Sequence, residues 1–181
     1  MPPSRPKHTT VSSILVRAAP RDPTRAIVQV GSLRFAAALG RSGRSAIKRE
    51  GDGATPIAPM ALLYGFYRAD RIARPATALS MTPIAPTMLW CDDPRDGCYN
   101  RPVGAPFAPS HEALARADNL YDICLVMDWN MSSRRRNGGS AIFFHLARPG
   151  YLPTEGCIAV RLADMRRLLR AIGPGTVVRV V

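Results

Sequence analysis

The sequence predicts a mainly β domain with one or two short helices, and three observations carry this prediction. Short apolar runs recur along the chain, turn residues such as Gly, Pro, Asn and Asp separate them, and one stretch has a clear helical period. With 181 residues, 46% of them hydrophobic, the chain is long enough for one domain with a sizeable core. We place this domain at residues 11–181 and expect the polar, proline-rich residues 1–10 to be a disordered lead.

The first part of the domain predicts three short strands, at residues 11–18, 26–30 and 33–39. Gly31-Ser32 supplies a two-residue hairpin turn between the last two of them. A basic, glycine-rich loop follows at residues 40–56, and no G-K-[ST] sequence completes a phosphate-binding loop there. We therefore expect a solvated, mobile loop.

The middle of the chain alternates between strands and a long irregular stretch. Residues 60–67 and 121–129 predict buried strands, while residues 69–110 are rich in proline and predict an insertion that lies over one face of the sheet. Ser110 is a suitable cap for a short helix at residues 111–117, with Glu112 favourable in its first turn.

The last part contains the stretch on which the functional interpretation depends, residues 140–161. It predicts a buried strand ending in His145, then a loop, then Gly156-Cys157 leading into a second apolar run. Residues 162–172 place their apolar side chains on one helical face, and residues 176–181 predict a closing strand.

A cysteine and a histidine at the edges of two apolar runs can meet if the two strands pair. Because the thiolate is the reactive form of cysteine, a nearby base such as His145 would make Cys157 a nucleophile near neutral pH. We then expect Cys157 to react well below the pH typical of a free thiol. The competing interpretation is structural, since an unpaired cysteine on an apolar strand is often an inert core residue.

The residues around the cysteine favour catalysis. Thr154-Glu155-Gly156-Cys157, preceded by His145, resembles the motif of the L,D-transpeptidase catalytic domain (YkuD-like) family, in which a histidine is followed by Ser or Thr, any residue, Gly and Cys. Lys48, Gly51-Asp52-Gly53 and Thr55-Pro56 also resemble a segment of that family, although Ala58 stands where a glycine is usual.

The resemblance implies a β-sandwich-like fold and a cysteine-dependent L,D-transpeptidase. Such an enzyme acts on peptidoglycan stem peptides through a thioester acyl-enzyme and so crosslinks or remodels the cell wall. Cys157 would be the nucleophile, His145 the base, and the backbone N–H groups of Gly156 and Cys157 the oxyanion donors. No cofactor is implied.

Two departures from the family motif concern the substrate-binding side. Glu155 stands where many members have a histidine, and Ala159 where many have an arginine that would hold a substrate carboxylate. We expect Glu155 to face the site, Thr154 to border it, and Arg161 or Arg148 to replace the missing arginine.

The net charge and the hydrophobic segments of the chain limit which partners and which cellular location we expect. The formal charge of +12 suggests an anionic partner, but the arginines are scattered, and with the resemblance we expect peptidoglycan and no nucleic acid. No signal peptide or membrane-spanning segment is visible, whereas the resemblance implies the cell envelope or periplasm. We expect a monomer.

The four cysteines form no C-x2-C pair, so we expect no metal site. Cys91 and Cys98 are close enough in sequence to form a disulfide, and Cys124 lies in an apolar run that predicts a core position.

Two alternatives remain beside the transpeptidase. Water could replace the acceptor amine, giving an L,D-carboxypeptidase or an amidase that uses the same residues. A non-catalytic, basic binding module is the alternative from another class.

Overall fold

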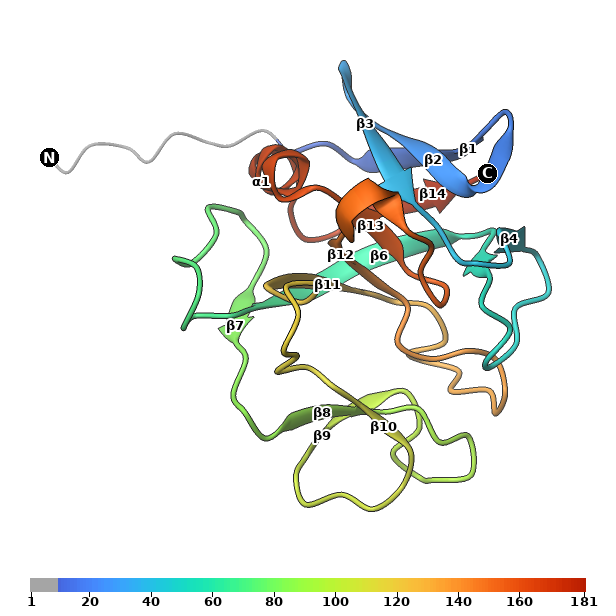
Figure 1. Cartoon of the computed structure of the whole chain (residues 1–181), viewed down its shortest axis with the longest axis vertical. Coiled ribbons are helices and arrows are strands. Elements are labelled where there is room, and N and C mark those ends of the chain that lie inside the picture. Colours follow the sequence, from blue (N-terminus) through green and yellow to red (C-terminus); the bar gives the residue numbers. More distant parts are fainter. Residues whose placement is uncertain (1–9) are drawn as a thin grey trace, which may run out of the picture.

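The computed structural model describes residues 10–181 (Figure 1), and the predicted lead at residues 1–10 lies outside this range except for the exposed Thr10. Its helical elements are a 3-10 turn η1 (Pro149–Tyr151) and the helix α1 (Leu162–Ala171). Its strands are β1 (Ser13–Ala19), β2 (Asp22–Val30), β3 (Leu33–Ala38), β4 (Arg44–Ser45), β5 (Thr55–Pro56), β6 (Pro59–Tyr67), β7 (Met81–Pro83), β8 (Met88–Cys91), β9 (Arg101–Gly104), β10 (His111–Ala113), β11 (Ile123–Met127), β12 (Phe143–Leu146), β13 (Ile158–Val160) and β14 (Val177–Val180).

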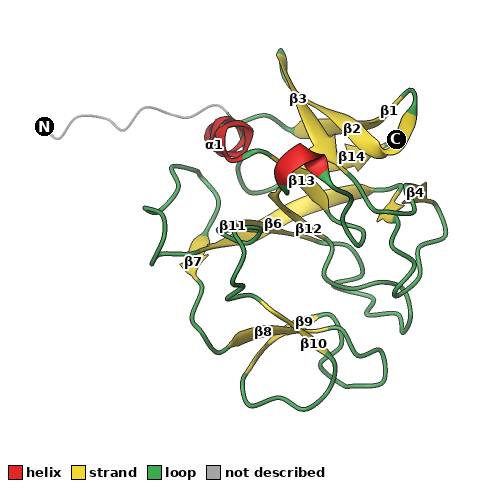
Figure 2. Ribbon diagram, viewed as in Figure 1, coloured by secondary structure: helices red, strands yellow, loops and turns green. Residues whose placement is uncertain are grey.

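The described residues form one large sheet of nine strands, in the order β11-β12-β13-β3-β2-β1-β14-β6-β7. Strand β6 also pairs with β11, so the sheet closes on itself and every strand except β7 lies in a ring. The prediction of a mainly β fold is confirmed (Figure 2), and the two layers expected of a sandwich are continuous here through this closure.

The main apolar core lies inside the ring because alternate residues of each strand point inward. Ile14 and Val16 of β1, Val28 of β2 and Phe144 of β12 are fully inaccessible to solvent and belong to this core. The hairpin turn predicted at Gly31-Ser32 is confirmed, since Val30 pairs with Leu33 across it and Gly31 has a φ of 56°.

Helix α1 covers one opening of this core and confirms the predicted helix. Met165, Leu168 and Leu169 are buried in the core, whereas Arg166 and Arg170 are exposed. The helix ends where Gly173-Pro174-Gly175 begins, and β14 then returns to pair in parallel with β1.

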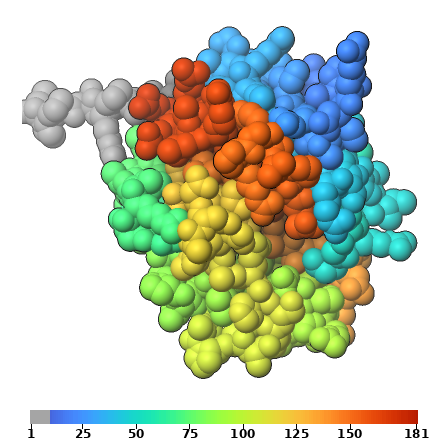
Figure 3. Space-filling view, in the orientation of Figure 1, coloured from blue at the N-terminus to red at the C-terminus, as the bar shows by residue number. Residues whose placement is uncertain are grey.

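Residues 68–122 form an insert between β6 and β11, and it is more ordered than the sequence suggests. Beyond β7, it carries a separate three-stranded sheet in the order β10-β8-β9. The insert forms the lower part of the molecule in Figure 1, and its green and yellow residues abut the orange stretch near residue 150 in Figure 3. Trp90 of β8 is fully buried and packs edge-on against Phe143 of β12, with 4.9 Å between ring centroids.

The helix predicted at residues 111–117 is wrong. His111–Ala113 is strand β10, and it pairs antiparallel with β8, placing Glu112 opposite Trp90. The local helical preference of so short a segment is small, and the backbone hydrogen bonds to β8 together with the burial of Leu114 outweigh it.

The four cysteines are all free thiols in the structure. Cys91 is buried on β8 and Cys98 is exposed, so the disulfide considered between them is not formed. Cys124 is fully buried, as predicted. Within residues 10–181, no helix is both long and apolar enough to cross a membrane.

Candidate active site

Strands β12 and β13 place the predicted histidine and cysteine on one face of the sheet. They pair in parallel, and His145 stands opposite Ala159. Because side chains alternate between the faces of a sheet, Cys157, two residues before Ala159, lies on the same face as His145. On the neighbouring strand β11, Cys124 stands directly opposite His145. The pairing on which the interpretation of His145 and Cys157 depended is therefore present.

The ring of His145 is fixed in one tautomer. Its Nδ1 lies 2.8 Å from the carbonyl oxygen of Leu146, and since a carbonyl only accepts, Nδ1 carries the proton. Nε2 is therefore the unprotonated nitrogen and can act as a base. The side chain is buried, and this burial lowers the pKa of His145 from 6.5 to about 4, so the imidazole is neutral at physiological pH.

The thiol of Cys157 is held by backbone groups. Its Sγ accepts a hydrogen bond from the N–H of Phe143 at 3.3 Å and donates one to the carbonyl of Ala141 at 3.2 Å. Burial raises the pKa of Cys157 to about 12, and the nearby charge of Glu112 adds to this increase, while the Phe143 N–H opposes it. This raised pKa runs against the expectation that the thiol would ionise unusually readily.

The loop before Cys157 is fixed by Thr154. Its hydroxyl donates to the carbonyl of Cys157 at 2.7 Å and accepts from the N–H of Gly156 at 3.2 Å. The N–H of Gly156 is thus occupied, and only the N–H of Cys157 remains from the expected pair of oxyanion donors. Gly156 has a φ of 133°, and a Cβ there would lie 2.9 Å from the carbonyl oxygen of Ala54, so its role in this structure is to permit the turn.

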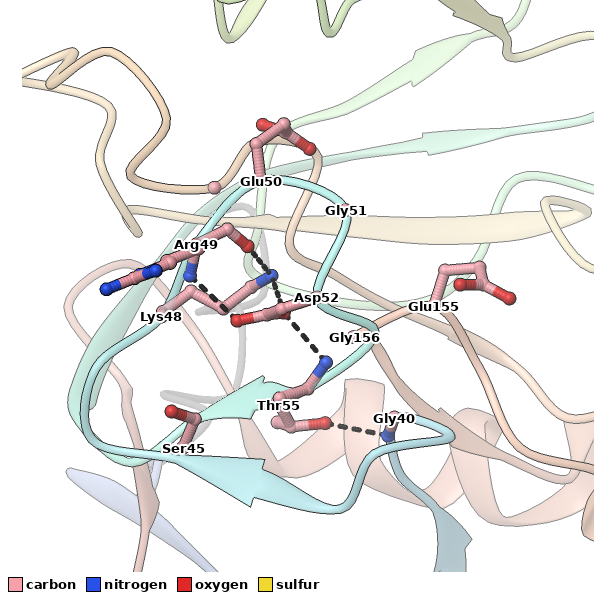
Figure 4. Close-up of polar contacts among 12 residues, drawn as sticks. Gly40, Ser45, Lys48, Arg49, Glu50, Gly51, Asp52, Thr55, Glu155 and Gly156 are labelled. Carbon is pink, nitrogen blue, oxygen red and sulfur yellow. Dashed lines mark hydrogen bonds and ion pairs between the residues drawn. The ribbon is translucent and has the colours of Figure 1, made fainter.

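The loop at residues 40–56 supports the cysteine loop and is not the freely solvated segment that the sequence suggested. The ammonium of Lys48 is buried and forms an ion pair of 2.5 Å with Asp52 (Figure 4). Asp52 also accepts from the N–H groups of Arg49 and Ala54, at 2.7 and 2.9 Å. Although partial burial opposes the effect, these hydrogen bonds lower the pKa of Asp52.

This locked loop positions Thr55 beneath the nucleophile. The hydroxyl of Thr55 accepts from the N–H of Gly40 at 2.9 Å, as Figure 4 shows, and donates to the carbonyl of Cys157 at 3.4 Å. The similarity noted in the Lys48–Pro56 segment therefore has a structural basis, because its ion pair holds the strand that contacts the cysteine loop.

A cavity of about 330 Å³ opens above Cys157 and His145. Its walls come from three parts of the chain: the loop at residues 40–56, the insert, and the segments that flank β12 and β13. The residues contributed by the insert are Asp92, Glu112, Arg116, Leu120 and Tyr121.

The expected substrate-binding residues differ in their placement. Thr154 and Arg148 line the cavity, and Arg148 is exposed there. Glu155 stands at the rim, but its carboxylate pairs with Arg41 at 2.7 Å and its side chain is 78% exposed, so it does not face the thiol. Arg161 lies outside the cavity lining, at the start of α1, where Asp164 holds it at 3.1 Å. Arg161 therefore lies outside the cavity, contrary to the expectation, whereas Glu155 borders it with its carboxylate turned toward Arg41.

Sequence reasoning missed the polar residues of the insert. Glu112 accepts a hydrogen bond of 2.6 Å from the hydroxyl of Tyr121, whose ring packs edge-on against that of His145 with 5.2 Å between centroids. Arg116 is held by Asp118 through contacts of 2.7 and 2.8 Å and lies over the Tyr121 ring. The spacing of Glu112 and Arg116 suggested successive turns of a helix, which concealed their position on a cavity wall.

A site built from a buried thiol, a histidine with a free Nε2 and a cleft beside them suits acyl transfer through a covalent intermediate. Residues 20–180 match the model of the YkuD family, described as the L,D-transpeptidase catalytic domain. The chain belongs to this family. Searches among characterised proteins and among solved structures gave no match.

Membership of the L,D-transpeptidase family fits the two features already described, a mainly β fold and a Thr-x-Gly-Cys loop placed beside a histidine. The family acts on peptidoglycan, and this chain is an enzyme of the L,D-transpeptidase type. Within residues 10–181, no group of three or more His, Cys, Asp or Glu side chains is placed to hold a metal ion.

Proposed function

We propose that this protein is a cysteine-dependent L,D-transpeptidase that acts on peptidoglycan stem peptides in the cell envelope through a thioester acyl-enzyme. The observation that carries the proposal is the placement of Cys157 and His145 on one face of paired strands, at the base of a cavity, with the His145 tautomer fixed by Leu146.

The first step starts from a neutral pair. Since the Cys157 thiol and the His145 imidazole are both uncharged at rest, proton transfer from Sγ to Nε2 accompanies attack on the carbonyl carbon of the donor stem. The carbonyl oxygen becomes an oxyanion, and the N–H of Cys157 is the donor available to it. The imidazolium then protonates the departing amine, which leaves as D-alanine.

The N–H of Phe143 has a separate role in this step. It already donates to Sγ at 3.3 Å, so it stabilises negative charge on sulfur as the proton leaves. In the second step, an amine of a neighbouring stem attacks the thioester, and sulfur leaves as the thiolate. Crosslinking or remodelling of the cell wall is the expected result.

The test is mass spectrometry on two samples from one reaction. The purified protein is mixed with disaccharide-tetrapeptide muropeptides, and both the intact protein and the soluble products are analysed over time. We expect a protein adduct with the mass of the whole donor muropeptide minus its terminal alanine, together with crosslinked dimers. A protein that never carries such an adduct, under conditions in which it is folded, would show that the proposal is wrong.

A further inference from the structure

The insert places the carboxylate of Glu112 in the cavity, and the first acylation step does not use it. Glu112 lies on β10, lines the same cavity as Cys157 and His145, and has a side chain that is 27% exposed. Only one of its two carboxylate oxygens has a hydrogen-bond partner among the described residues, and this difference indicates a function.

One oxygen of Glu112 is held and the other is open. Oε1 accepts from the Tyr121 hydroxyl at 2.6 Å and lies 3.5 Å from Nη1 of Arg116. Arg116 is mainly bound to Asp118, through two shorter contacts of 2.7 and 2.8 Å. Oε2 accepts no hydrogen bond from any residue in the described range 10–181, so it is available to a ligand in the cavity.

The position of Glu112 is fixed relative to the catalytic pair. Tyr121 holds the carboxylate through its hydroxyl while the edge of its ring packs against His145. The opposite strand neighbour of Glu112, Trp90, packs against Phe143, whose N–H donates to the Cys157 thiol. The carboxylate is therefore tied from two directions to the strand that carries the site.

Two further polar residues line the same cavity, Asp92 and Ser140. Oδ1 of Asp92 and Oγ of Ser140 are buried and form no hydrogen bond with the described residues, and the Ser140 side chain belongs to a residue that is 7% exposed. Both residues contribute to the cavity wall, so the surroundings of Glu112 are polar.

The second half-reaction needs a group of this kind. An acceptor amine on a stem peptide arrives as an ammonium ion, which has no lone pair and cannot attack a thioester. His145 can accept only one proton, and the attacking nitrogen must lose two in forming an amide.

Resting on the proposed function, we propose that Glu112 is the catalytic base that binds the acceptor ammonium and removes its first proton, so that the acyl group passes to an amine in preference to water. The Oε2 atom takes one proton from nitrogen, and the freed lone pair attacks the thioester carbonyl. The C–S bond then breaks as the amide C–N bond forms. The second nitrogen proton passes through Nε2 of His145 to the sulfur, and Glu112 releases its proton to solvent.

The charged surroundings of Glu112 suit this role. Partial burial raises the pKa of Glu112, against the lowering effects of Tyr121 and Arg116, while Asp92 and Asp118 act with burial. A carboxylate with a raised pKa is a stronger base toward an ammonium ion, and it also attracts that cation into the cavity.

The experiment separates the acceptor step from acylation. The Glu112→Gln variant keeps the acceptor oxygen for Tyr121 and the shape of the side chain but cannot take a proton. We expect it to form and hydrolyse the acyl-enzyme at least as fast as the wild type, because loss of the Glu112 charge no longer disfavours the Cys157 thiolate. Transfer to a stem-peptide amine should instead fall roughly 100-fold, as for loss of a general base.

Hydroxylamine distinguishes a chemical role from a structural one. It is largely uncharged at neutral pH and needs no initial deprotonation, so Glu112→Gln should transfer the acyl group to hydroxylamine as fast as the wild type does. Asp70→Asn is the matched control, because it alters a carboxylate of the insert that is paired with Arg68 and lies outside the cavity lining. This control should transfer to both acceptors normally.

The outcomes are distinct. If the wild type forms no acyl-enzyme, the proposed function is wrong. If the wild type transfers to stem amines and Glu112→Gln does so equally well, or if the variant loses hydroxylamine transfer to the same extent, the role assigned to Glu112 is wrong.

Discussion

The two faces of the β12–β13 strand pair are equally buried but chemically different. The inner face packs into the closed sheet, and each of its residues is at most 2% exposed: Phe144, Leu146, Ile158 and Val160. The outer face is at most 8% exposed and carries Phe143, His145, Cys157 and Ala159. A shift of one residue along the strand therefore separates the core from the chemistry.

The comparison shows that the insert, and not the strands, determines the properties of the site. The outer face would lie open to water without Trp90 and Tyr121, which pack on Phe143 with ring centroids 4.9 and 5.8 Å away. Covered in this way, the thiol and the imidazole lose hydration, and each favours its uncharged form. The Cys157 thiol and the His145 imidazole are thus both uncharged at rest, and charge develops on them only when the thiol attacks the substrate.

The largest effect is expected on the outer face. Cys157→Ala should lower acylation by roughly 10⁴-fold or more, because no other group replaces a missing nucleophile. Its free energy of unfolding should change little, since the thiol occupies a cavity wall and not the main core. Intact-protein mass spectrometry and thermal unfolding measure the two effects.

Cys98→Ala is the matched control for that variant, because the Cys98 thiol is exposed and is not part of the cavity lining. It should acylate like the wild type. If the adduct persisted in Cys157→Ala and disappeared in Cys98→Ala, the assignment of Cys157 as the nucleophile would be wrong.

A substitution on the inner face should reverse this pattern. Phe144→Ala removes a fully buried ring from the main core and should lower the free energy of unfolding by about 3–5 kcal/mol. The fraction of molecules that remains folded should still acylate, because the Cys157 thiol and the His145 ring are on the other face. Chemical denaturation and active-site titration with a thiol reagent provide the two measurements, and a folded but inactive variant would contradict the separation of the faces.

Much of the strand pattern could be predicted from the sequence, because alternation and glycine turns act locally. The hairpin at Gly31, the helix at residues 162–171 and the pairing that brings His145 to Cys157 follow from such signals. The closure of the sheet through β6 and β11 could not be predicted, because it depends on a pairing between strands more than fifty residues apart.

The site was predictable only where its residues are close in sequence. Thr154, Gly156 and Cys157 lie in one motif, whereas Glu112 reaches the cavity because β10 pairs with β8. Glu155 shows the opposite error: its place beside the cysteine suggested an inward side chain, but Arg41 from a distant loop holds it outward. Neighbours in space decide such orientations.

The pH dependence is a subtler test of the covered face. Since burial lowers the pKa of His145 from 6.5 to about 4, the base stays neutral into the acidic range, and the acidic limb of kcat/KM should lie near pH 4. A limb near 6.5 would indicate a hydrated imidazole.

The same shift makes a prediction for stability. Between pH 6.5 and 4 the unfolded chain binds a proton at this histidine and the native protein does not, so stability falls as pH falls through this range. The loss should reach up to about 3 kcal/mol at the acidic end, and it should be smaller in His145→Gln. Unfolding free energies of both proteins across this range measure it.

The smallest effect is expected from Glu155→Gln. Comparing it with Glu112→Gln contrasts a carboxylate that is near the thiol in sequence with one that lines the same cavity. Glu155 is paired with Arg41 and 78% exposed, so solvent and salt screen its charge. Glu112 lines the cavity, and after burial its charge is the larger contribution to the raised pKa of Cys157. Alkylation of Cys157 measured across pH should therefore be unchanged in Glu155→Gln, whereas in Glu112→Gln it should become faster at a given pH because the thiolate is less disfavoured. Equal acceleration in both variants would mean that Glu155 turns inward in solution, and the role of the Arg41 pair would have to be abandoned.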